Sequence, residues 1–116
     1  MAKIALRPYL IEITDMIDHG QFEEAIAHCR HILERFPKHI ETYRILGKAY
    51  LEAQQYGDAT DILQRVLSSI PGDFVANIGL SIIREDEGNI DASIWHMERS
   101  FESQPAHQAV QEELRR

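Results

Sequence analysis

The side chains best suited to chemistry in this sequence are its histidines and its one cysteine. His28 and His31 lie on either side of Cys29, and histidines three residues apart can share one face of a helix. A zinc ion held there would need a third and a fourth ligand, and no nearby motif supplies them. His19 and His39 lie at predicted turns, and nothing in the sequence requires them to meet. The pattern therefore predicts no metal site.

Other catalytic patterns are missing as well. The acidic run Glu85-Asp86-Glu87 lacks the alternating ligand spacing of a calcium loop and is expected to be a solvated helix end. The sequence contains no glycine-rich phosphate loop, nucleophile elbow or metalloprotease motif, and no spacing of serine and histidine that suggests a triad. We therefore expect a protein without a cofactor that is not an enzyme.

The charge balance limits the classes of partner. The chain has 116 residues with 44% hydrophobic and 27% charged residues, which is typical of one globular domain, and its net charge is −7. Nucleic-acid binding is disfavoured because it would require a basic patch. Residues 74–116 hold 4 basic and 8 acidic side chains. Two interpretations stay open, a basic partner near this end or an acidic surface that only aids solubility.

The lone Cys29 excludes an internal disulfide and is compatible with a reducing compartment. It falls in the inward-facing column of its predicted helix, so we expect a buried thiol of low reactivity. The first residues lack an apolar run long enough for a secretory signal, and no stretch approaches the ~20 apolar residues of a membrane span. The expected location is the cytoplasm, with no membrane contact.

Apolar residues recur at helical spacing along nearly the whole chain. Tyr43, Leu46 and Tyr50 follow this spacing, and Ala59 and Leu63 follow it after a polar turn. Prolines and turn residues separate the periodic segments. The predicted helices span about residues 8–18, 22–36, 39–53, 56–70, 74–87 and 90–103.

The helical pairs repeat with a fixed period. Pro37, Pro71 and Pro105 are spaced by 34 residues, and several other columns keep this period. Among these columns are Gly20, Gln54 and Gly88 at the turns, then Phe22, Tyr56 and Ile90, then Ala25, Ala59 and Ser93. Together with the Leu46-Gly47 pair, this pattern resembles the tetratricopeptide repeat (TPR) family.

The resemblance implies an all-α fold, a right-handed superhelix of three helix–turn–helix repeats in one domain over residues 1–116. The expected repeats are residues 6–39, 40–73 and 74–107, and residues 108–116 are expected to form a capping helix. Ala106, Val110 and Leu114 give this last segment a narrow apolar stripe, and the first helix of a truncated fourth repeat is the alternative.

Two repeats depart from the family pattern. In the first, Ile13 stands where a small residue is expected, and we predict that it pushes two helices apart or shifts the helix by a residue. In the third, Asn77 and Arg84 occupy the columns of Tyr43 and Tyr50. Terminal repeats are commonly atypical because one face lacks a neighbouring repeat.

The resemblance also implies that the first helices of the repeats line a concave groove. The middle of this groove would carry two cations, Arg44 and Lys48, between two apolar ends. A peptide or helix with apolar anchors and a carboxylate for the two cations would complement it. Filling of the apolar positions by the chain itself is the alternative. The candidate groove residues are Leu10, Thr14, Ile17, Arg44, Lys48, Leu51, Val75, Ile78 and Ile82.

The expected function is that of a non-catalytic protein-interaction module that acts as a scaffold or adaptor. A self-associating structural element is the first alternative, since apolar residues such as Leu6 and Leu114 lie near the two ends. A docking domain taken from a larger protein is the second.

Overall fold

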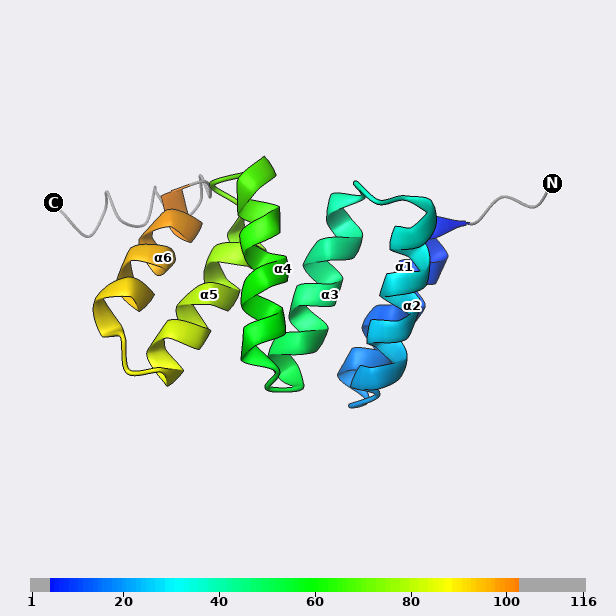
Figure 1. The fold of residues 1–116 in the computed structure, drawn as a ribbon, viewed down its shortest axis with the longest axis horizontal. Coiled ribbons are helices and arrows are strands. Elements are labelled where there is room, and N and C mark those ends of the chain that lie inside the picture. The colour runs from blue at the N-terminus through cyan, green and yellow to red at the C-terminus, as the bar shows by residue number, and fades with distance from the viewer. Residues whose placement is uncertain (1–4, 103–116) are drawn as a thin grey trace, which may run out of the picture. The chain divides into compact units, whose positions relative to one another are not determined.

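The computed structural model describes residues 5–102, and in this range the chain forms six α-helices and no strand. Figure 1 shows these helices in chain order. The predicted all-α fold is confirmed, whereas the expected capping helix lies outside the described residues. The helices are α1 (Leu6–Asp18), α2 (Phe22–Arg35), α3 (Ile40–Glu52), α4 (Tyr56–Ser69), α5 (Phe74–Asp86) and α6 (Ile90–Glu102).

The helix boundaries keep the period of the sequence. The helices α1, α3 and α5 begin at Leu6, Ile40 and Phe74, and all three contain 13 residues. Each start therefore follows the previous one by the same 34 residues that separate Pro37 from Pro71. Most predicted boundaries agree within one residue. The largest difference is at α1, which begins two residues before the predicted start at Pro8, so that Pro8 lies within its first turn.

Three turns inside the helical pairs share one backbone geometry. Gly20, Gln54 and Gly88 have left-handed backbones, with φ of 78°, 61° and 81°. The next residue in each turn donates its N–H to a carbonyl five residues earlier, as Gln55 does to Tyr50 at 2.9 Å. Gln54 also donates its own N–H to the Leu51 carbonyl at 3.0 Å. These two bonds define a Schellman motif, which satisfies the last carbonyls of the preceding helix.

Polar side chains cap the N-termini of α3 and α5, the first helices of the second and third predicted repeats. Asp73 Oδ2 accepts a hydrogen bond from the Ala76 N–H at 2.9 Å, and His39 Nδ1 accepts one from the Thr42 N–H at 3.3 Å. These side chains satisfy backbone donors that have no partner within the helix. The residue before α1, Ala5, cannot do this and makes no such side-chain bond.

The described contacts divide the chain into two compact units, residues 1–62 and 63–116, with the boundary inside α4. In the first unit, α1 packs on α2 and on α3, and α2 packs on α3. Ile13, Cys29 and Ile32 are fully buried there. Burial of these and the other apolar side chains between the helices supplies the main stabilising term of the unit.

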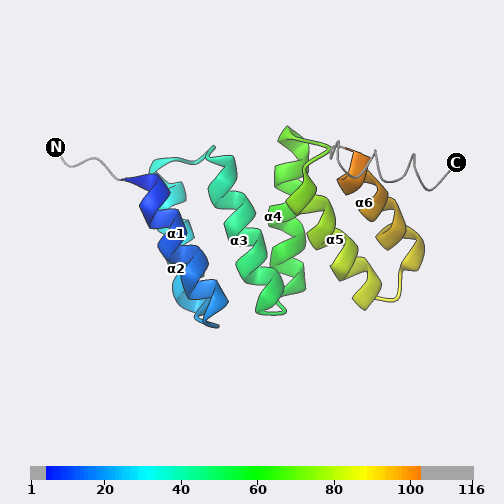
Figure 2. The ribbon, with the colours of Figure 1, turned by 180° about the vertical axis from the view of Figure 1, so that it is seen from behind.

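In the second unit, α5 and α6 pack along their length (Figure 2). Ser81 and Ser93 lie at this contact, where the Ser81 hydroxyl donates to the Ser93 carbonyl at 2.9 Å. Both side chains are buried, as are Leu80 and Ile83. The small serines thus allow the two helices to approach closely while their hydroxyl groups remain hydrogen-bonded.

The departures from the repeat pattern have different outcomes in the two units. Ile13 is fully buried, and α1 keeps its place in the period, so the predicted shift by one residue does not occur. The contact of α1 with α2 is less extensive than that of α5 with α6. This difference agrees with the alternative expectation, that Ile13 holds its two helices apart, since the bulk of a side chain at a helix contact sets the distance between the axes.

Candidate functional site

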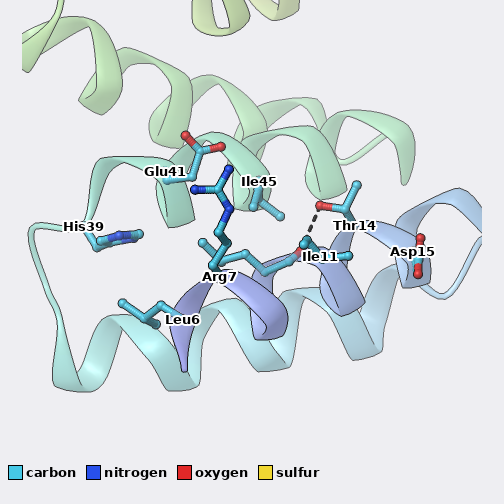
Figure 3. Close-up of a pocket in the computed structure, with 9 residues that line it drawn as sticks. Leu6, Arg7, Ile11, Thr14, Asp15, His39, Glu41 and Ile45 are labelled. Atoms are coloured by element: carbon cyan, nitrogen blue, oxygen red, sulfur yellow. Dashed lines mark hydrogen bonds between the residues drawn. The ribbon is translucent and has the colours of Figure 1, made fainter. Parts of the chain in front are cut away.

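A hollow of about 620 Å³ lies between α1 and α3 in the first unit. Leu6, Leu10 and Ile11 line it from α1, and Ile45 lines it from α3. Figure 3 shows these two helices on either side of the hollow. Ile11 is 58% exposed, which is high for an isoleucine within a packed helix. The hollow therefore offers apolar surface to water in a concave setting.

Polar groups surround this apolar surface. Arg7, Asp15 and Glu41 bring charges of both signs, and Figure 3 shows the Arg7 side chain extending toward Glu41. Thr14 also lines the hollow, but its hydroxyl donates to the Leu10 carbonyl at 2.9 Å within α1. One basic and two acidic side chains thus border the hollow, which gives it only a weak preference for the sign of ligand charge.

Arg44 has a carboxylate partner within the chain. Its Nη1 atom lies 2.9 Å from Glu41 Oε2, one helical turn earlier on α3. The two side chains are 25% and 53% exposed, so solvent weakens the pair. A carboxylate from a partner would still have to compete with Glu41 for this guanidinium group.

The predicted groove residues divide into three groups. Leu10 and Thr14 line the hollow, whereas Ile17 is 2% exposed and does not line it. Arg44, Lys48 and Leu51 are half-buried on α3. The third group lies on α5, where Val75 and Ile82 are exposed and Ile78 is half-buried.

Several residues of the hollow were not among the predicted groove residues. Leu6 lies one turn before Leu10, and its place on the same face of α1 was readable from the spacing of four. His39 lines the hollow because it is the N-cap residue of α3. Histidine is not among the preferred N-cap residues, so the sequence indicates this position only weakly. Asp15 lies four residues after Ile11, a spacing that places the two on the same face of α1.

His28 and His19 have hydrogen-bonding neighbours, and Cys29 is buried. The Tyr9 hydroxyl lies 2.6 Å from His28 Nδ1, and His19 Nδ1 lies 2.7 Å from the Asp15 carbonyl. Burial raises the pKa of the Cys29 thiol to about 12, so the thiolate is scarce at neutral pH, in agreement with the expected low reactivity. Within residues 5–102, no three His, Cys, Asp or Glu side chains are grouped so that they could hold a metal ion.

The comparison with protein families decides the classification. The family model described as tetratricopeptide repeat matches residues 16–78, more than half of the chain. The chain belongs to the tetratricopeptide repeat family. Repeats of this family are generally protein-interaction modules and typically non-catalytic. No curated protein matches the chain.

None of the described helices is both long and apolar enough to cross a membrane.

Proposed function

We propose that this tetratricopeptide repeat protein is a non-catalytic interaction module that binds a peptide or helix of another protein. The binding surface would include the hollow between α1 and α3 of the first unit. The observation that carries the proposal is the exposed apolar surface within that hollow, led by Ile11. Concave apolar surface of this kind is rarely left without a function.

Apolar anchors would supply most of the affinity at this hollow. An apolar side chain of the partner placed against Leu6, Ile11 and Ile45 would remove their surface from water. The expected carboxylate of the partner would add less, because Arg44 already meets Glu41. Packed helices hold the surface in place before binding, so the partner meets little ordering cost on this side. The cytoplasm remains the location that we propose, since the lone thiol fits a reducing compartment.

A quantitative affinity capture from native lysate tests this function with two matched variants. Ile11→Asp places a charge in the hollow, and Ala27→Asp places the same charge at an exposed position of α2. We expect partners recovered with the wild type to be reduced at least tenfold with Ile11→Asp and retained with Ala27→Asp, because burying an unpaired carboxylate against an apolar anchor is costly. Circular dichroism would verify that both variants fold.

Equal recovery of all partners by Ile11→Asp and the wild type would contradict a binding role for the hollow. Light scattering on the same samples would address self-association, the main alternative. A dimer that Ile11→Asp dissociates, with no other protein captured, would replace the proposed function with a structural one.

A further inference from the structure

One face of α5 in the second unit is apolar and open to water. Val75 and Ile82 are 40% and 44% exposed, and Ile78 between them is half-buried. The spacings of three and four residues place the three side chains on one face of the helix. The opposite face is already used, because Leu80 and Ile83 are fully buried. We call Val75, Ile78 and Ile82 the α5 stripe.

Two carboxylates lie at the end of the α5 stripe. Glu85 and Asp86 follow Ile82 by three and four residues, so they lie one turn further along the same face, about 5 Å along the axis. Both are exposed, and within residues 5–102 neither has an ion-pair partner. The neighbouring Glu87 does, since its Oε1 lies 2.7 Å from Arg84 Nη1.

These carboxylates stand at the less favourable end of their helix. The last turn of a helix carries a partial negative charge, which repels an acidic side chain and attracts a basic one. Glu85 and Asp86 therefore lower the stability of α5 when the protein is alone. A cation placed beside them would remove this repulsion and would also be attracted by the helix end. The site thus has a stronger charge preference than the hollow between α1 and α3, where Arg7 offsets one of two carboxylates.

Resting on the proposed function, we propose that the α5 stripe binds a basic amphipathic segment of a partner protein. Its apolar side chains would cover Val75, Ile78 and Ile82, and a lysine or arginine that follows them would pair with Glu85 and Asp86. The acidic net charge of −7 would favour the encounter with such a segment. An acidic or purely apolar segment would leave the two carboxylates without a counter-charge.

Selection from a random peptide library displayed on phage tests this proposal without knowledge of the partner. The targets are the wild type, Glu85→Lys/Asp86→Lys, and the control Asp91→Lys/Glu98→Lys. The control makes the same change of charge at two exposed positions of α6. We expect wild-type and control selections to enrich apolar peptides with an excess of lysine and arginine, and the α5 variant to lose that excess.

A synthetic copy of the leading wild-type peptide then gives the affinities. We expect its Kd to rise roughly tenfold for Glu85→Lys/Asp86→Lys and to change little for the control, as two attractive ion pairs become repulsive. The preference for basic peptides should fade at 1 M salt, where the Debye length is about 3 Å. Thermal melting should show the α5 variant to be at least as stable as the wild type, which separates lost binding from lost folding.

Two further variants separate this proposal from the proposed function. Peptides that fail to bind Ile82→Asp but bind Ile11→Asp support the α5 site. Peptides that fail to bind Ile11→Asp but bind Ile82→Asp support the proposed function and overturn the α5 site. If the wild type enriches peptides without an excess of lysine and arginine, the α5 site is also overturned. Absence of any enriched peptide overturns both.

Discussion

At the scale of single residues, Asn77 keeps a hydrogen bond that Tyr43 makes one repeat earlier. The Tyr43 hydroxyl donates to the Pro37 carbonyl at 2.7 Å, and Asn77 Nδ2 donates to the Pro71 carbonyl at 3.2 Å. Asn77 Nδ2 also donates to the Asp73 carbonyl at 3.0 Å, and the side chain is fully buried. In the third repeat, a chemically different residue thus makes the equivalent connection between the first helix and the turn that precedes it.

This substitution marks a limit of prediction from the sequence. In the sequence, Asn77 only indicates that a large aromatic residue is missing from this column. That its two Nδ2 hydrogens bond the Pro71 and Asp73 carbonyls follows only from the coordinates. The repeat period, by contrast, was readable because Pro37 and Pro71 recur at a fixed interval. Periodic apolar and turn residues thus predict helix positions well, whereas a buried polar contact depends on atoms that a residue type alone does not place.

Asn77 also involves His96 of α6. The Asn77 Nδ2 group donates to two carbonyls, and its Oδ1 atom can only accept. The His96 Nδ1–H therefore donates to Oδ1 across 3.0 Å. Burial, followed by the charge of Arg84, lowers the pKa of His96 below 6.5. The folded state therefore binds fewer protons than the unfolded state. This contribution to stability is present above pH 6.5 and is lost as the pH falls through the lowered pKa.

His96→Gln should weaken the acid sensitivity of folding. Between pH 7 and pH 5 we expect the wild type to lose more of its unfolding free energy than this variant, because glutamine has no proton to gain. Urea denaturation at several pH values measures the difference. His31→Gln, at an exposed position of α2, should follow the wild type. An identical pH slope for wild type and His96→Gln would show that His96 takes no part.

At the scale of elements, the three turns inside the helical pairs require the same left-handed backbone but not the same residue. Glycine adopts it at Gly20 and Gly88, whereas Gln54 adopts it with a side chain. The left-handed conformation costs a side-chain-bearing residue about 1–2 kcal/mol. The central turn is therefore under local strain that the sequence period alone would not reveal.

Gln54→Gly should stabilise the protein by about 0.5–1 kcal/mol. The relief of backbone strain exceeds the extra chain entropy that glycine brings to the unfolded state. Gly88→Ala should destabilise by a similar amount because the backbone angle opposes it, although no described residue beyond the chain neighbours of Gly88 has an atom within 4 Å of the added Cβ. Gly57→Ala is the control. It also meets open space but lies within α4, so it should stabilise. Denaturant midpoints measure all three.

The predicted groove residues show how element geometry limits the prediction of a site. Arg44 and Lys48 were expected as cations for a partner, yet the spacing of three from Glu41 lets Arg44 pair on its own helix. The place of Ile17 in the family pattern pointed to the groove, and the structure buries it. Val75 and Ile82, however, are exposed on α5. Their role in binding stays a prediction.

At the scale of the whole molecule, the described contacts are local in the sequence. Within each unit, the helices that pack are neighbours along the chain or, for α1 and α3, separated by one helix. Such contacts close short loops, so little chain entropy is lost before they form. Proteins with local helical contacts fold in microseconds to milliseconds.

Refolding after dilution from urea should accordingly be fast. We expect the dominant phase to be complete within about 10 ms at 25 °C, because the described helices that pack are at most one helix apart in the chain. Stopped-flow circular dichroism at 222 nm would follow the helices of both units together. A dominant phase slower than about 1 s would indicate that contacts far apart in the sequence limit folding.

The chain has one cysteine and one tryptophan, and they report on different units. Cys29 is fully buried in the first unit, and Trp95 of α6 is 52% exposed in the second, with the Arg99 guanidinium 5.2 Å from its ring centre. A thiol reagent can therefore modify the protein only when the first unit opens, while the emission spectrum follows the second. Two measurements on the unmodified sequence can thus time the opening of each half and show whether the halves open together.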